Sequence, residues 1–190
     1  MILILDNYDS FTYNLAQYAG SINTNIKIIR NDELTVDEIR KFNISHIIIS
    51  PGPGNQFKTG IAIDLIKKLS PQIPTLGICL GHQTIGHCFN AKIVKSKKIM
   101  HGKTSTISHN NKSILYQKIP TKFKVTRYHS LSVDREYKHK DIEITSWSDD
   151  GEIMSIEHKK LPIYGLQYHP EAILTEHGSK IMENFLNIVV

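Results

Sequence analysis

The chain has 190 residues, of which 40% are hydrophobic and 22% charged, and its formal net charge is +5. A chain of this length buries roughly 70% of its unfolded surface, so we expect one domain spanning residues 1–190. Its two cysteines are too few for a disulfide framework and suggest a reducing compartment. No apolar run approaches the ~20 residues that cross a bilayer, and the apolar run after Met1 is too short for a signal peptide.

We therefore expect a soluble, intracellular protein with no membrane partner. Abundant Ile, Lys and Asn suit an AT-rich genome, so the expected location is a bacterial cytoplasm or a plastid stroma. The positive charge raises the question of nucleic-acid binding. The densest basic segment, Lys92–Lys103, contains neither arginine nor an aromatic side chain. We interpret it as a solvated or partner-facing surface and expect no nucleic-acid partner.

Strand-like and helix-like segments alternate along the first half. Ser10 is expected to cap a helix on which Phe11, Leu15 and Tyr18 share a face. Thr35 and Glu38 form a capping box that opens the next helix. The predicted strands are 2–5, 25–30, 46–50 and 74–78, and the later predicted helices are 35–42, 61–69 and 80–89. This alternation predicts an α/β fold: an open, mostly parallel, twisted sheet with helices on both faces.

The second half is rich in strands. The predicted strands are 91–94, 104–108, 123–126, 142–147, 153–158 and 163–168, and a helix is predicted over 176–188. Asp149-Asp150-Gly151 is a hairpin signal. We expect these strands to extend the sheet in antiparallel fashion.

Cys79 lies in Gly77-Ile78-Cys79-Leu80-Gly81, between a predicted strand and a predicted helix. Small residues around a nucleophile let a strand turn sharply into a helix and expose the side chain at the edge of the sheet. The helix N-terminus then favours a thiolate and any oxyanion beside it.

A candidate base follows the last predicted strand. His169 and Glu171 are two residues apart in Gln167-Tyr168-His169-Pro170-Glu171, and in extended backbone such residues point to the same side. The carboxylate can therefore hold one ring nitrogen while the other faces Cys79. A thiol, a base and a group that orients the base are the parts of a nucleophilic acyl-transfer site.

A third segment, Ser50-Pro51-Gly52-Pro53-Gly54, follows another predicted strand. Because ligands bind at the carboxyl ends of parallel strands, we expect it near Cys79, although a plain surface turn is the alternative. The ten histidines show no metal-binding spacing, and no phosphate loop or dinucleotide fingerprint occurs, so we expect no metal and no cofactor. Cys88 is expected to pack in the core. The histidines expected to be structural or to make polar contacts are His82, His87, His101, His109 and His129.

These three segments resemble the class I (triad) glutamine amidotransferases, and the resemblance runs nearly end to end. Three further segments are similar to one branch, the glutaminase subunits that serve anthranilate or p-aminobenzoate synthesis: residues 6–15, 101–103 and 127–131. By this resemblance Cys79 attacks the side-chain amide of glutamine, His169 transfers protons and Glu171 orients His169. The resemblance further implies an oxyanion hole from the N–H groups of Gly52 and Leu80. The implied glutamine-binding residues are Gly52, Pro53, Gly54, Gln83, Ser130 and Leu131.

The resemblance also implies a partner. Ammonia released here would pass to a chorismate-using synthase subunit, either anthranilate synthase component I or aminodeoxychorismate synthase component I. A glutaminase for p-aminobenzoate synthesis, or one shared by both pathways, is the alternative; the segment 6–15 argues against guanylate synthesis. A non-catalytic module that keeps the fold is disfavoured because the thiol, the imidazole and the carboxylate are all present. Ala172 and Lys98 depart from the family pattern, and Lys98 leaves the predicted partner contact open.

Overall fold

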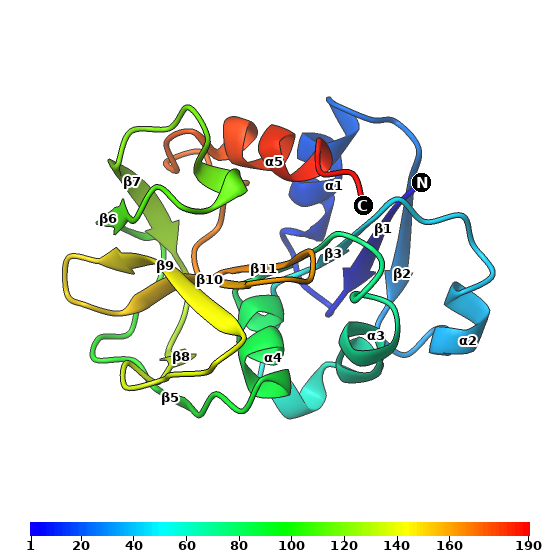
Figure 1. The fold of residues 1–190 in the computed structure, drawn as a ribbon, viewed down its shortest axis with the longest axis horizontal. Coiled ribbons are helices and arrows are strands. Elements are labelled where there is room, and N and C mark those ends of the chain that lie inside the picture. The colour runs from blue at the N-terminus through cyan, green and yellow to red at the C-terminus, as the bar shows by residue number, and fades with distance from the viewer.

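The computed structural model describes residues 1–190, and Figure 1 shows one twisted sheet between two layers of helices. Its strands are β1 (Ile2–Asp6), β2 (Ile26–Arg30), β3 (His46–Ile49), β4 (Thr75–Ile78), β6 (Lys103–His109), β7 (Lys122–Arg127), β9 (Ile142–Ser148), β10 (Ile153–His158) and β11 (Ile163–Leu166). The nine strands are ordered β2-β1-β3-β4-β11-β10-β9-β6-β7. Pairing is parallel from β2 to β11 and antiparallel from β11 to β7, which confirms the predicted fold class.

Helices cover both faces of the sheet. The helices α1 (Thr12–Gly20) and α5 (Gly178–Leu186) pack on one face, and α2 (Val36–Ile39), α3 (Ala62–Lys68) and α4 (Leu80–Cys88) on the other (Figure 1). Two short 3-10 turns are η1 (Gln56–Lys58) and η2 (Ile114–Tyr116).

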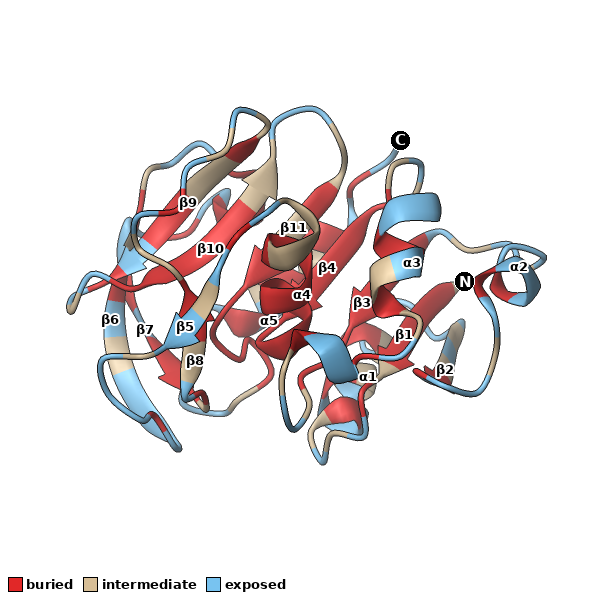
Figure 2. Cartoon of the chain, turned by 90° about the horizontal axis from the view of Figure 1, so that it is seen from below, coloured by how far each residue is buried: buried red, intermediate tan, exposed pale blue.

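The central strands are buried on both sides, as Figure 2 shows. In β1, Ile2 and Ile4 contribute to the core under α1 and α5, while Leu3 and Leu5 contribute to the core under α2 to α4. Because successive side chains alternate between the faces, a continuous aliphatic run supplies two cores at once.

The strand predicted at 91–94 does not extend the sheet. The strand β5 (Ile93–Lys95) pairs instead with β8 (Leu131–Val133), which was not predicted, in a separate two-stranded sheet. Both segments lie close to α4: a Cβ at Gly86 would lie 3.3 Å from Ala91, which precedes β5, and 3.0 Å from Val133 of β8. The two short strands therefore pack against α4 rather than at the sheet's edge.

The prediction that Ser10 caps the first helix is wrong. Ser10 is exposed, and α1 begins at Thr12 without a side-chain cap. Carboxylates organise this turn instead: Thr12 Oγ1 donates to Asp6 Oδ1 over 2.7 Å, and Phe11 N donates to Asp9 Oδ2 over 2.8 Å. The carboxylate of Asp9 thus accepts the backbone N–H of Phe11, and the carboxylate of Asp6, at the end of β1, holds the side chain of Thr12.

Two other predictions from local sequence signals, a capping box and a turn, are confirmed. Thr35 and Glu38 form the predicted capping box, although α2 ends at Ile39 rather than Phe42. Gly151 has φ +77 and its N–H donates to Ser148 O over 2.8 Å, which confirms the predicted turn between β9 and β10. The last strand of the sheet ends at Leu166, two residues earlier than predicted.

Candidate active site

Cys79 lies on a sharp strand-to-helix turn between β4 and α4, as predicted. Its backbone has φ 51 and ψ −99, a conformation that side-chain-bearing residues rarely adopt. The flanking glycines make the turn possible. A Cβ at Gly77 would lie 2.5 Å from the carbonyl carbon of Gly81, and a Cβ at Gly81 would lie 2.4 Å from Ile49 O. The glycine bracket is therefore required by close packing of β3, β4 and α4.

The sheet brings the predicted base to the same edge. Leu166, the last residue of β11, is in register with Ile78, and Cys79 N donates to Leu166 O over 2.7 Å. The chain then leaves β11 and His169 pairs with Thr126 of β7, where its N–H donates to Thr126 O over 3.1 Å. The strand β11 is far from β4 in the sequence but adjacent to it in the sheet, and it therefore brings His169 close to Cys79.

His169 and Glu171 form a buried pair with the predicted geometry. His169 Nδ1 lies 2.6 Å from Glu171 Oε1, and both residues are buried. Burial alone would lower the pKa of His169, but the adjacent Cys79 and Glu171 outweigh it and raise this pKa to about 10. Thiol and imidazole are thus neighbours. No hydrogen bond forms between them, because His169 Nε2 has no partner of good geometry.

Other side chains surround the sulfur and the ring. Gln167 Nε2 donates to Cys79 Sγ over 3.6 Å, and Sγ lies 3.9 Å from the carbonyl oxygen of Tyr128. The rings of Phe11 and Tyr128 pack edge-on against His169, with centroid distances of 5.9 and 5.0 Å. Sequence reasoning assigned no role to Phe11 in the site, to Tyr128 or to Gln167, although each lies in a segment that carried the resemblance.

A cavity of about 200 Å³ opens beside Cys79. Its lining residues are Gly52, Pro53, Gly54, Cys79, Leu80, Gln83, Tyr128, His129, Ser130 and Leu131. Every residue expected to bind glutamine or form the oxyanion hole therefore lies on this cavity, whereas His169 and Glu171 do not line it. His129, expected to be structural or to make polar contacts, adds to the lining. The rim at Pro53, Gly54 and Ser130 is exposed.

Two residues that line the cavity, Gly52 and Leu80, have backbone N–H groups without a hydrogen-bond partner inside the protein. Leu80 is the first residue of α4, where N–H groups lack intrahelical acceptors, and Gly52 N makes no hydrogen bond. The glycine at 52 has a structural reason as well: a Cβ there would lie 2.5 Å from Asn7 O. Asn7 Nδ2 in turn donates to Ser50 O over 2.8 Å, which joins the turns after β1 and β3.

The remaining candidates lie apart from this chemistry. Cys88 is half-buried, and burial raises the pKa of its thiol to about 11, which suits a packing role. His82 is fully buried, and burial lowers its pKa to about 4. No three His, Cys, Asp or Glu side chains gather where they could ligate a metal ion. None of the helices has the length and apolar composition needed to cross a membrane.

The fold is that of the glutamine amidotransferases, and the family model "Glutamine amidotransferase class-I" matches residues 3–189. The chain belongs to this family. It is 52% identical over 188 residues to anthranilate synthase component 2 of Cyanophora paradoxa, covering 98% of both chains. It is 49% identical to the bifunctional protein TrpGD of Thermotoga maritima, covering 98% of this chain and 32% of that protein.

A solved structure supports the same fold. A protein from Thermoplasma acidophilum, described as one of the subunits of GMP synthase, superposes with a TM-score of 0.86 at 26% identity, covering 97% of this chain and 91% of that one.

Proposed function

We propose that this chain is the glutaminase component of an anthranilate synthase, which hydrolyses glutamine and delivers ammonia to a chorismate-using subunit. One observation carries the chemistry: Cys79, on a strained turn beside a cavity, neighbours a buried His169–Glu171 pair. Identity of 44–52% to proteins named anthranilate synthase component 2 supports the assignment to this pathway. The residues expected to bind glutamine line the cavity, which supports glutamine as the substrate.

In this proposal the Cys79 sulfur attacks the side-chain carbonyl carbon of glutamine and forms a γ-glutamyl thioester. With its raised pKa, His169 holds a proton at neutral pH, which favours the thiolate and supplies the proton for the leaving ammonia. The same imidazole then takes a proton from the water that hydrolyses the thioester. Glu171 accepts from Nδ1–H and so directs Nε2 toward the sulfur.

The free N–H groups of Gly52 and Leu80 would hold the oxyanion of the tetrahedral intermediate. Removing such a donor typically costs about 2.7–4 kcal/mol of transition-state stabilisation. The glutamine-binding segment, which we define as residues 128–131, would hold the α-amino and carboxylate end of the substrate. Gln83 supports this arrangement: its Nε2 already donates to Leu131 O and Gln167 Oε1. Its Oε1 then remains to accept from the α-ammonium group.

The test is glutamate release in the presence of the chorismate-using subunit, comparing the wild-type chain with Cys79→Ser. We expect the substitution to abolish release. Equal rates in the two proteins would end the proposal.

The pathway needs a separate test. Complementation of a tryptophan auxotroph and of a p-aminobenzoate auxotroph distinguishes anthranilate synthase from the alternative, aminodeoxychorismate synthase. We expect growth of the tryptophan auxotroph, while rescue of only the p-aminobenzoate auxotroph would reassign the chain to the alternative.

A further inference from the structure

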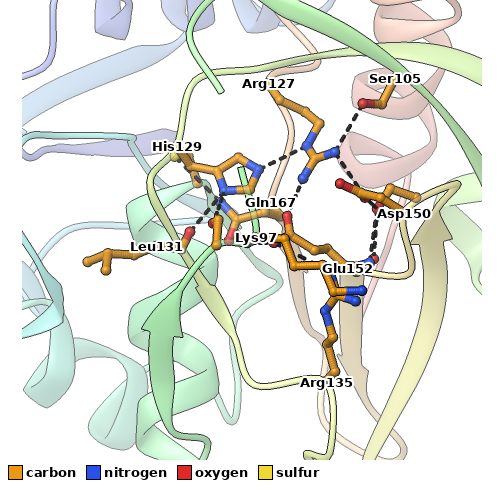
Figure 3. A network of polar contacts seen from close by, with 12 residues as sticks. Lys97, Ser105, Arg127, His129, Leu131, Arg135, Asp150, Glu152 and Gln167 are labelled. Carbon is orange, nitrogen blue, oxygen red and sulfur yellow. Dashed lines mark hydrogen bonds and ion pairs between the residues drawn. The ribbon is translucent and has the colours of Figure 1, made fainter. Parts of the chain in front are cut away.

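A buried ion pair lies directly behind the glutamine-binding segment. Arg127 and Glu152 are 0% and 1% exposed, and Arg127 Nη2 donates to Glu152 Oε2 (Figure 3). Neither residue lines the cavity. Two charges are taken out of water here, and such pairs are weak contributors to stability because desolvation offsets their attraction. A contribution to stability therefore does not by itself explain why these two charges are buried.

All three nitrogens of the Arg127 guanidinium are engaged. Nη1 donates to Ser105 Oγ over 3.0 Å and to Asp150 Oδ1 over 3.3 Å, while Nε donates to His129 Nε2 over 3.0 Å (Figure 3). A planar group held on three sides cannot rotate without breaking several hydrogen bonds. The position of His129, a member of the glutamine-binding segment, is therefore tied to the position of Arg127.

The hydrogen bonds of His129 fix its tautomer. Arginine can only donate, so His129 Nε2 is an acceptor; the carbonyl oxygen of Leu131 can only accept, so Nδ1 carries the proton and donates over 2.9 Å. Burial and the adjacent Arg127 lower the pKa of His129 to about 3, which keeps the ring neutral. The neutral ring thus links Arg127 to Leu131, at the far end of the segment.

Glu152 anchors the loop that runs beside the segment. Its Oε1 accepts from Lys97 N over 2.9 Å. The loop 96–102 then follows the segment, with Ser96 N donating to Ser130 O and Met100 N donating to His129 O, both over 2.9 Å. One carboxylate therefore holds both Arg127 and the start of this loop.

The far end of the segment leads to the nucleophile. Leu131 O also accepts from Gln83 Nε2 over 2.9 Å, Gln83 Nε2 lies 3.2 Å from Gln167 Oε1, and Gln167 Nε2 donates to Cys79 Sγ. A continuous set of polar contacts thus joins the ion pair, the cavity wall and the sulfur.

We propose that the Arg127–Glu152 pair is a positioning unit for glutamine: it holds residues 128–131 in the geometry that binds the substrate. The inference rests on the proposed function and deepens it. Neither residue touches the substrate, and both act through His129 and the adjoining loop. The pair therefore governs substrate affinity more than the chemical step.

The experiment replaces both charges with apolar side chains of similar length, Arg127→Met together with Glu152→Met, so that neither member of the pair is left buried without the other. Asp150 and Arg135, which each lose one ion-pair partner, are partly exposed to solvent. Loss of binding that is the same in the ground state and the transition state raises KM and leaves kcat unchanged. We therefore expect the KM for glutamine of the complex with the chorismate-using subunit to rise about tenfold or more, with kcat changed by less than about threefold. In the same complex, glutamine should protect Cys79 of the double variant from iodoacetamide only at correspondingly higher concentrations.

Two comparison variants make the test decisive. Arg127→Lys, which keeps the charge but loses the planar fork, should fall between wild type and the double variant. Asn184→Ala removes buried hydrogen bonds to Leu115 O and Gln117 O, away from the cavity, and should leave the KM unchanged. A folded double variant with the wild-type KM would overturn the inference, as would an equal rise of KM in Asn184→Ala. Failure of glutamine to protect Cys79 in the wild-type complex would instead remove the proposed function.

Discussion

At the residue scale, the backbone conformation of Cys79 has a free-energy cost that only a functional role explains. Its φ of 51 combined with ψ −99 lies outside the regions open to residues with a Cβ. Conformations of this kind cost on the order of 1–3 kcal/mol and persist where the surrounding structure enforces them. Here the enforcing contacts are those of Gly77 and Gly81, which bring α4 against β3 and β4.

This strain predicts a reversed order of stability for two substitutions. Alanine normally stabilises a folded chain over glycine by about 0.5–1 kcal/mol. At position 79, Cys79→Gly should be more stable than Cys79→Ala by about 1–2 kcal/mol, because only glycine adopts this conformation without strain. Urea unfolding of the two inactive variants measures the difference. The ordinary order, with alanine more stable, would show that the turn is unstrained.

The His169–Glu171 pair makes a prediction about pH. Because folding raises the pKa of His169 from 6.5 to about 10, the pair's contribution to stability is complete below about pH 6.5 and is lost as the pH rises through about 10. Glu171→Gln removes the charge that stabilises the imidazolium. It should destabilise the protein by about 1–3 kcal/mol at the low-pH end, and by less above about pH 10.

Two measurements check this prediction. NMR titration of the His169 ring should give a clearly lower pKa in Glu171→Gln, and urea unfolding at both ends of the pH range should show the difference shrinking. Proton transfer by a poorly oriented ring should also lower glutaminase kcat by about 100-fold. An unchanged His169 titration would contradict the assigned pairing.

At the scale of elements, the turn between β4 and α4 requires glycine, which has no side chain, at positions 77 and 81. A methyl group at Gly77 would meet Gly81 at 2.5 Å and Ile85 Cδ1 at 2.6 Å, so the helix would have to move away from the sheet. Backbone contacts of this kind do not relax cheaply, because both partners belong to regular elements packed in the core.

We therefore expect Gly77→Ala to destabilise the protein by about 3 kcal/mol or to prevent folding. Gly20→Ala is the matched control: a Cβ there would lie 3.6 Å from Ile26 Cδ1, and the residue ends α1. It should be neutral or stabilising by up to about 1 kcal/mol. Thermal unfolding compares the two variants. Equal stabilities would mean that the helix shifts freely.

The features that could be predicted from the sequence are those with local signals. The glycine bracket of Cys79 and the two-residue spacing of His169 and Glu171 depend on neighbours in sequence. The strand β8 gives no such signal, because three residues are too few to show a period. Arg127 and Glu152 are separated by 25 positions and resemble surface charges in sequence. Only the pairing of distant strands buries them together.

At the scale of the whole molecule, the sheet gathers the site from segments that are far apart in the chain. The turns after β1, β3 and β4 and the segment after β11 meet at the carboxyl ends of the parallel strands, where open sheets bind ligands. The antiparallel half contributes a second wall, the glutamine-binding segment, which follows β7. The parallel half thus supplies Cys79 and the cavity wall at residues 52–54, and the antiparallel half supplies the cavity wall at residues 128–131.

The geometry of the site predicts that the isolated chain is a poor glutaminase. The hydrogen bond between Cys79 and His169 is not closed, and the rings of Phe11 and Tyr128 cover His169. The cavity rim at Pro53 and Gly54 is exposed. We expect the chorismate-using subunit to cover this edge and raise glutamate release about tenfold or more, since small changes in such geometry have effects of this size. Glutamate release by the chain alone, titrated with that subunit, measures the effect. Full activity without the subunit would show that the site is complete as it stands.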